Sequence, residues 1–383
     1  MAVYLDHNAT TPLHEDVLMA MLPVMRAMVG NPSSLHRYGR LQKDTIEKAR
    51  EQVAQLVDAH PDEVVFTSGG TEANNLLVKG AAGSASIHRM ALSNVEHQSM
   101  LEPAAAIGDA VAVDYIAVDS GGKVTPQALR QTIRSDTGLV SVMTANNETG
   151  VIQDIRSLAE IARGHGLWFH TDASQAAGKI DVSFKDWGVH AMTLSSHKIY
   201  GPQGAGALIA DRQLPLRALL HGGSQERKLR AGTENVAAIA GFGAAAELAK
   251  TELTDRATQV LKLRMALEQG LAQMPAVSIF AQHAERLPNT VQFGVRGFDG
   301  ETLLMQLDRK GIAVSSGSAC TSGKTEPSHV LKAMNIPAEL ALSAIRVSFG
   351  TDNTLADVEK LLRTLGEIIN TMSNSAVMMA ANL

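Results

Sequence analysis

The chain has 383 residues, of which 45% are hydrophobic and 19% are charged, and its net charge at pH 7 is -5. This length is more than one hydrophobic core usually covers, so two domains are expected. The slightly acidic balance argues against a nucleic-acid or membrane-surface binder, and the sequence shows neither a signal peptide nor a stretch of about 18 apolar residues that would span a membrane.

Strands and helices are predicted to alternate through the first two-thirds of the chain. Apolar residues at three- and four-residue spacing predict an amphipathic helix over 41–57. The strands expected after it are 63–68, 89–94, 111–118, 139–144, 167–172, 190–196 and 206–210, and the expected helices are 71–81, 99–108, 125–133 and 154–166. This alternation with short connections predicts an α/β fold, with a mainly parallel seven-stranded sheet between helices.

The pattern changes near residue 250. Helices are predicted over 254–274, 300–310 and 354–369, and Thr354 and Asp357 resemble a capping box at the start of the last one. We therefore expect a large domain over 13–254 and a smaller C-terminal α/β domain over 255–383. Residues 1–12 are expected to pack on the smaller domain.

Polar clusters follow several of the predicted strands, where ligands bind in sheets of this kind. In TSGGTEANN (67–75), glycines precede a helix start and leave backbone N–H groups that favour an anion. Gly70 and Thr71 therefore predict a phosphate seat, although the segment taken alone is also an ordinary turn with a helix cap. It matches neither a Walker loop nor a dinucleotide-binding fingerprint.

Lys198 lies between a predicted strand end and a loop rich in glycine and proline. A solvated loop lysine is the ordinary interpretation. The functional interpretation is a lysine that forms a Schiff base with a cofactor. That chemistry requires an amine at a fixed depth in a polar pocket, and a residue at the end of a strand can provide it. Ser195 and His197 flank it and could hydrogen-bond a phosphate.

Three further side chains suit a pyridoxal-phosphate (PLP) ring. Asp172 ends a predicted strand, and a carboxylate against the pyridine nitrogen keeps that ring an electron sink; an aspartate capping the next helix is an equally good interpretation. Gln175, one helical turn later, could reach the ring hydroxyl. His97 follows another strand and could stack on the ring and move protons.

Cys320 is the one cysteine of the chain, which excludes intrachain disulfides and cysteine-clustered metal sites and indicates a reducing, cytoplasmic location. It lies among small flexible residues in 313–331, so an accessible nucleophilic thiol fits better than a buried apolar side chain. Arg346, on a predicted strand, offers a guanidinium fork suited to a substrate carboxylate. No metal site is expected.

Together these segments resemble the cysteine desulfurases of the NifS/IscS type, in the class V aminotransferase group of fold-type-I PLP enzymes. The matching strings run nearly end to end and include YLDHNATTP, VVFTSGGTEANN, NVEHQ, NNETGVIQDI, HTDASQAAGK, SSHKIYGPQG, HGGSQERKLRAGT, SSGSACTSG and IRVSFG. Ser196 departs from the pattern, since glycine or alanine is common at that position. Residues 372–383 lack the extended tail that helps dock the scaffold protein in housekeeping members.

The resemblance implies a role for each candidate residue. Lys198 would hold PLP covalently, Asp172 would pair with its pyridinium nitrogen, His97 would stack on the ring and Gln175 would contact the ring oxygen. The phosphate would be held by Gly70, Thr71, Ser195, His197 and, from the partner subunit of a homodimer, Thr233. The substrate carboxylate would be bound by Asn147 and Arg346, and Cys320 would carry a persulfide.

The implied function is conversion of L-cysteine to L-alanine, with the sulfur passed from Cys320 to a sulfur-acceptor protein for iron–sulfur cluster assembly or thiolation. No nucleic-acid or membrane partner is implied. The alternatives are a selenocysteine lyase, another class V aminotransferase or lyase, and a non-enzymatic PLP-fold binding subunit. An aminotransferase has no need of Cys320 in a flexible segment, and a binding subunit has no need of Lys198. Selenocysteine activity and the identity of the acceptor stay open.

Overall fold

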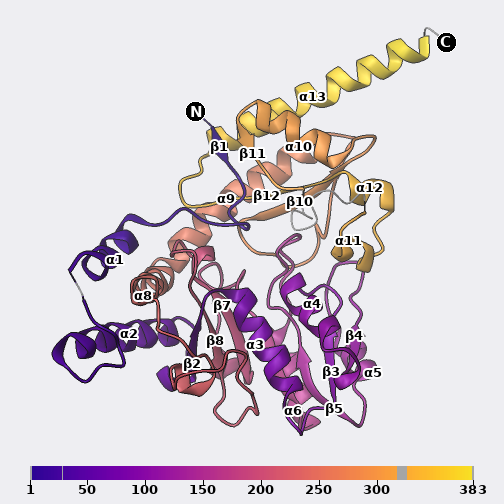
Figure 1. Cartoon of the computed structure of the whole chain (residues 1–383). Helices are drawn as coiled ribbons and strands as arrows, with labels where there is room; N and C mark the ends of the chain where they lie inside the picture. The colour runs from indigo at the N-terminus through magenta and orange to yellow at the C-terminus, as the bar shows by residue number, and fades with distance from the viewer. Residues whose placement is uncertain (1, 28, 317–325, 382–383) are drawn as a thin grey trace.

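The computed structural model describes residues 2–27, 29–316 and 326–381. Up to about residue 250 the chain forms a seven-stranded sheet, which lies in the lower part of Figure 1. Its strands are β2 (Val64–Thr67), β3 (Arg89–Ser93), β4 (Ala112–Ile116), β5 (Thr137–Ser141), β6 (Trp168–Asp172), β7 (Ala191–Ser195) and β8 (Gly206–Ala210). Six of them lie within predicted strands, and β5 begins two residues before the predicted strand 139–144. The predicted α/β fold with a mainly parallel seven-stranded sheet is confirmed.

The strands are ordered β2-β8-β7-β6-β5-β3-β4 across the sheet. The pairs β3–β4, β3–β5, β5–β6 and β6–β7 are parallel. β8 is antiparallel to both of its neighbours, β2 and β7. The carboxyl ends of β5, β6 and β7 therefore open at one edge of the sheet, where the loops that follow them meet.

Helices cover both faces of this sheet. They are α1 (Glu15–Ala27), α2 (Arg37–Leu56), α3 (Gly70–Ala82), α4 (Gln98–Ala106), α5 (Pro126–Thr132), α6 (Ile155–Gly164), α7 (Phe184–Trp187) and α8 (Val236–Thr251). Along β8, Ala207 and Ile209 join the core shared with α2, α6 and α8, whereas Leu208 and Ala210 join the core shared with α3 and α4. Successive strand residues point to opposite faces, so both faces are buried.

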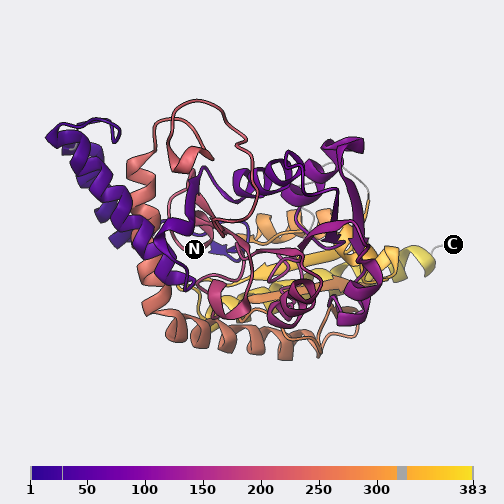
Figure 2. The ribbon, with the colours of Figure 1, turned by 90° about the horizontal axis from the view of Figure 1, so that it is seen from below.

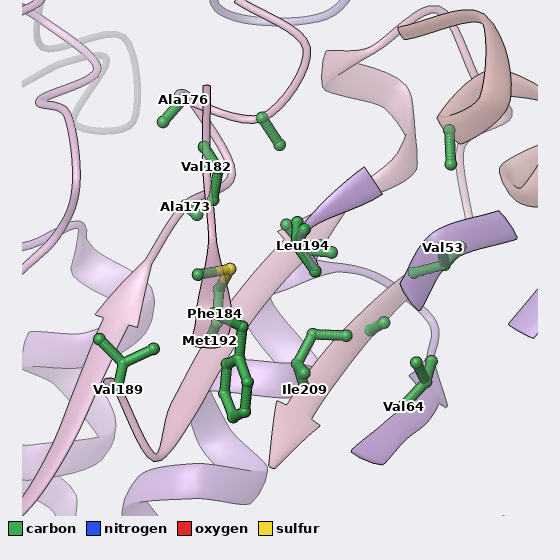
Figure 3. Close-up of a cluster of buried hydrophobic side chains, with 14 of the residues drawn as sticks. Val53, Val64, Ala173, Ala176, Val182, Phe184, Val189, Met192, Leu194 and Ile209 are labelled. Carbon is green, nitrogen blue, oxygen red and sulfur yellow. The ribbon is translucent and has the colours of Figure 1, made fainter. Parts of the chain in front are cut away.

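Figure 3 shows the first of these cores. Met192 and Leu194 of β7 and Ile209 of β8 project to the same side of the sheet, where Val53 of α2 also lies. All four side chains are buried. This packing holds the strands whose carboxyl ends carry Asp172 and Ser195.

The rest of the chain builds a second core, in the upper part of Figure 1. Its elements are α9 (Leu253–Leu271), β9 (Val277–Ile279), β10 (Thr290–Val295), α10 (Gly300–Arg309), β11 (Ile312–Ala313), β12 (Ala344–Ser348) and α13 (Leu355–Ala381). The short helices α11 (His329–Ala333) and α12 (Ala338–Leu342) pack in a separate small cluster. Strands β12, β10 and β9 form an antiparallel sheet in that order. Arg346 lies on β12, as predicted.

The N-terminus packs with this second core. β1 (Val3–Tyr4) pairs in parallel with β11, and Val3 and Leu5 belong to the same buried cluster as Phe293 of β10. Residues 7–11 then lead back to the edge of the large sheet, where Thr11 bonds the carbonyl of His197. The division into domains 13–254 and 255–383 stays a prediction.

Several helices depart from the sequence analysis. α1 was not predicted; it carries Pro23 in its interior and is amphipathic over only 13 residues. α8, whose sequence is interrupted by glycines, and the short helices α7, α11 and α12 were not predicted either. α13 extends to Ala381 and not to 369, and residues 370–381 contain neither glycine nor proline, the residues that most often end a helix. Among the described residues, none of the helices combines the length and apolarity needed to cross a membrane.

Candidate active site

A cavity of about 300 Å³ opens at the carboxyl ends of β6 and β7. All of the predicted site residues in the described part of the chain, except Thr233, line it, namely Gly70, Thr71, His97, Asn147, Asp172, Gln175, Ser195, His197, Lys198 and Arg346. Among its other lining residues are Asn8, Ala9, Ser99 and Ser174. Segments separated by more than 300 positions in the sequence therefore meet in one polar hollow.

Asp172 is the last residue of β6 and is buried. Its Oδ2 accepts a hydrogen bond from the Asn74 side chain at 2.8 Å, and its Oδ1 accepts one from the backbone N–H of Ser174 at 2.9 Å. These two bonds hold the carboxylate in one orientation in the cavity wall. The sequence analysis did not identify Asn74 as a site residue. Its position one helical turn after Gly70 could have indicated that it lies near the predicted phosphate seat.

A hydrogen-bond chain runs from Asp172 to His97. The Asn74 amide donates to the Ser99 hydroxyl at 2.8 Å, and that hydroxyl lies 2.8 Å from His97 Nδ1. The Ser99 backbone N–H also donates to Nδ1, at 3.1 Å, so Nδ1 is an acceptor and the proton of the neutral ring lies on Nε2. Burial lowers the pKa of His97, and the charge of Lys198 lowers it further, while that of Asp172 opposes the shift. In this tautomer the ring nitrogen that is not bonded to Ser99 is Nε2, which is a hydrogen-bond donor.

Lys198 ends a short 3₁₀ turn, Ser196–Lys198, directly after β7. Its Nζ donates to the backbone carbonyls of Asn8 at 2.5 Å and Ala9 at 2.7 Å. The adjacent His197 contacts the Thr10 hydroxyl through Nδ1 at 3.1 Å. Burial and the charge of Lys198 lower the pKa of His197 to about 4. The N-terminal segment thus holds the lysine amine at a defined depth.

Gly70, Thr71, Ser195 and His197 form what we call the α3 group. Gly70 and Thr71 begin α3, a helix of 13 residues, so their backbone N–H groups lie at its positive end. A shallower groove that adjoins the cavity is lined by the same four residues. The buried hydroxyl of Ser174, also in the cavity wall, has no hydrogen-bond partner within the described part of the chain.

Asn147, Arg346 and Asp6 form what we call the β12 group. Arg346 is buried, and its Nη2 donates to Asp6 Oδ1 at 2.6 Å, while its Nη1 donates to the Asn147 carbonyl at 2.9 Å. Its Nε has no partner among residues 2–27, 29–316 and 326–381. Asp6 was missed in the sequence analysis, because nothing local marks a carboxylate 340 positions away from its arginine.

One predicted site residue in the described part of the chain lies outside this cavity. Thr233 is exposed on the segment before α8 and does not line the cavity of its own chain. Its predicted contact with the partner subunit's cofactor stays a prediction. Cys320 lies outside the described residues. In the described part of the chain, no cluster of three or more potential metal-ligating side chains occurs.

The chain matches the family described as aminotransferase class-V over residues 3–361. It is 43% identical to a cysteine desulfurase IscS of Dictyoglomus turgidum, over 96% of this chain and 94% of that protein. It is 42% identical to the IscS of Methanosarcina thermophila, over 97% of this chain and 93% of that protein.

Solved structures are similar too. A NifS-like protein superposes with a TM-score of 0.91 at 36% identity, covering 97% of this chain and all of that one. A structure described as SspA in complex with cysteine superposes with a TM-score of 0.82 at 30% identity, covering 92% of this chain and all of the other.

Proposed function

The chain belongs to the aminotransferase class V family, among the cysteine desulfurases of the IscS and NifS type, and we propose that it performs this reaction with PLP held on Lys198 and with Cys320 as the sulfur carrier. The family implies PLP dependence. The observation that carries the assignment of residues is the single cavity lined by the Lys198 amine, the Asp172 carboxylate and the Arg346 guanidinium.

The described residues fit PLP. The cavity holds a buried carboxylate for the ring nitrogen at Asp172 and a helix start with flanking hydroxyls for a phosphate in the α3 group. The Ser174 hydroxyl is a buried polar atom without a partner in the described chain, which a bound polar ligand would satisfy. When bound, PLP supplies an electron sink that stabilises negative charge on the substrate Cα.

The protein's own residues then have separate tasks. Arg346 and Asn147 bind the substrate carboxylate, and the Arg346 Nε has no partner of its own in the described chain. The Lys198 amine moves the Cα proton. His97, neutral and tied to Ser99 through Nδ1, carries its proton on Nε2 and can donate it to a bound group. The Cys320 thiolate takes the substrate sulfur as a persulfide, and alanine leaves.

We propose a homodimer on the basis of one exposed apolar face. Leu35 and Tyr38, at the start of α2, are 90% and 60% exposed, and Met25 and Val29 nearby are also exposed. Figure 2 shows α2 beside α8, with the segment between β8 and α8 looping out next to them. A hollow of about 760 Å³ lies between α2 and residues 224–234 of that segment. A second copy on this face would cover the apolar side chains and bring Thr233 toward the α3 group.

A spectrum followed by a cysteine assay tests the proposal. The purified protein should absorb near the edge of the visible range. With L-cysteine and a reductant it should release sulfide and alanine in equal amounts. Cys320→Ala should abolish both products and keep the absorbance, whereas Lys198→Ala should remove the absorbance. A colourless protein that stays colourless after PLP is added would overturn the assignment of Lys198.

The sulfur acceptor is proposed by class only. We propose a protein acceptor in iron–sulfur cluster assembly or thiolation, since a persulfide on a protein thiol is a form of sulfur that a second thiol can accept. Transfer of ³⁵S from L-cysteine to candidate proteins tests this. A label that leaves Cys320 only as free sulfide would contradict it.

A further inference from the structure

Lys179 lies behind the candidate active site and has no role in the function proposed above. It is absent from the wall of the 300 Å³ cavity and borders instead a small cavity of about 30 Å³, which it shares with Lys198. Its Nζ donates to Gln175 Oε1 at 2.8 Å and to Asn8 Oδ1 at 3.0 Å. Lys179 therefore contacts two side chains that do line the active-site cavity.

These contacts decide which way the Gln175 amide points. The amide nitrogen, Nε2, donates to the backbone carbonyl of Asn8 at 2.9 Å, and a carbonyl can only accept. Lys179 lies at the other end of the amide, and an ammonium group can only donate. Both neighbours thus favour the same orientation, with Oε1 toward Lys179 and Nε2 toward Asn8.

The hydrogen-bond partners of the Asn8 side chain fix the orientation of its amide in the same way. Its Nδ2 donates to the carbonyl of Asn147 at 3.2 Å, and its Oδ1 accepts from Asn289 Nδ2 at 3.1 Å as well as from Lys179. Asn289 Nδ2 in turn donates to the carbonyl of Phe349 at 3.1 Å. Because backbone carbonyls end the network on two sides, neither asparagine amide can flip without losing hydrogen bonds.

We propose that Lys179 is a positioning residue: by occupying Oε1 of Gln175, it makes that side chain present an N–H donor, and never its carbonyl oxygen, to the ring oxygen of PLP. This inference rests on the proposed function, in which Gln175 contacts that oxygen. An amide nitrogen has two hydrogens, so one is left for a ligand after the bond to Asn8. A donor stabilises the anionic form of the ring oxygen, whereas a carbonyl would repel it.

The protonation state of Lys179 does not alter this orientation. Burial lowers the pKa of Lys179 well below its ordinary value, and the charges of Lys198 and Arg346 lower it further. A neutral amine still carries two N–H bonds, one for each of the oxygens that Lys179 contacts. In both states its neighbours at Gln175 and Asn8 are acceptors.

A double-mutant cycle on the full-length protein tests the inference. The variants are Lys179→Met, which keeps the length of the side chain without its donors, Gln175→Ala, and the two combined. For each, PLP is titrated into protein freed of cofactor, and the dissociation constant and the visible spectrum are recorded. Lys185→Met, at an exposed lysine, is the matched control.

Lys179→Met should weaken PLP binding by roughly three- to tenfold, the size of one or two net hydrogen bonds. Its spectrum should shift toward the form with a protonated ring oxygen. The double variant should match Gln175→Ala within about twofold, because residues in one network are not additive. If Lys179→Met does not fold, the cycle is run with Lys179→Gln, whose amide can donate or accept and so no longer imposes an orientation.

Two results would overturn the inference. One is a Lys179→Met protein with the wild-type dissociation constant and spectrum. The other is a double variant in which the two effects multiply, which would mean that Lys179 does not act through Gln175. Failure of the proposed function looks different, since the wild-type protein would then bind no PLP or make no alanine from L-cysteine.

Discussion

The α3 group and the β12 group contribute to the same cavity through different kinds of contact. Gly70, Thr71, Ser195 and His197 come from two short segments, each at the junction of a strand and a helix or turn. Arg346 and Asp6 are 340 positions apart and meet as an ion pair at 2.6 Å. The α3 group consists of backbone N–H groups and neutral side chains that are close in sequence within each segment. The β12 group contains a charged pair whose members come from the two ends of the chain.

This difference predicts that substitutions can affect the binding of L-cysteine and the binding of PLP separately. A neutral hydrogen bond contributes about 1 kcal/mol and a bond to a charged group about 1.5–3 kcal/mol. Changes in the β12 group should therefore have large effects on L-cysteine and small effects on PLP. Changes in the α3 group should have modest effects, mainly on PLP.

Arg346→Ala should have the largest effect and is the most direct test of this difference between the two groups. Loss of a forked guanidinium should remove about 3–4 kcal/mol of binding to the substrate carboxylate, which lowers kcat/KM for L-cysteine by roughly 100- to 1000-fold. The PLP dissociation constant should change by less than about twofold. Steady-state alanine production and PLP titration measure the two effects. Arg212→Ala, at an exposed arginine paired with Asp62, is the control. A parallel loss of PLP would show that the two groups are not separable.

Asp6→Asn tests whether the β12 group is itself held by charge. The side chain keeps its shape but no longer neutralises a buried arginine, so the free energy of unfolding should fall by about 2 kcal/mol. Denaturant unfolding measures it. Asp62→Asn, in the exposed pair with Arg212, should change stability by less than about 0.5 kcal/mol. Equal effects in the two variants would contradict the importance of burial.

Glu96 extends this comparison, because it is a buried carboxylate that forms no ion pair with any described residue. Its Oε1 accepts from the Ser93 hydroxyl at 2.7 Å and the Met143 N–H at 2.6 Å, and its Oε2 has no partner in the described chain. Burial raises its pKa to about 8, so the native state keeps this proton between pH 5 and 8 while the unfolded state loses it.

The native state then binds more protons than the unfolded state, so Glu96 makes stability fall as pH rises through that interval. Glu96→Gln should remove this fall. Its stability relative to wild type should increase with pH by at most about 1.4 kcal/mol per unit. Unfolding free energies at pH 5.5, 7 and 8.5 test this; parallel curves for the two proteins would show that Glu96 is ionised when buried.

Thr71→Val should have the smallest effect. Valine keeps the β-branched shape and the backbone of the helix start but removes the hydroxyl, so PLP should bind about fivefold more weakly, or about 1 kcal/mol. KM for L-cysteine at saturating PLP should stay within about twofold of wild type. A large rise in KM with unchanged PLP affinity would reverse the roles of the two groups.

Several parts of the site could be predicted because their signals are local. Asp172 and Ser195 end strands whose apolar residues mark them in the sequence, and Lys198 comes soon after the second of these strands. Parallel strand ends meet at one edge of a sheet. Asn74 and Ser99 were not predicted, since their importance depends on a hydrogen bond between α3 and α4. Lys179 follows Gln175 by four positions, but only the structure shows which oxygens its amine contacts.

The sequence by itself determined the alternation of strands and helices, the α/β class and the position of the lysine, aspartate and histidine relative to strand ends, because hydrophobic periodicity and turn residues act over a few positions. The tertiary structure alone decided the order of the strands, the antiparallel direction of β8, the pairing of Asp6 with Arg346 and the orientation of the Gln175 amide. Those features depend on contacts between residues distant in sequence, whose partners no local pattern specifies.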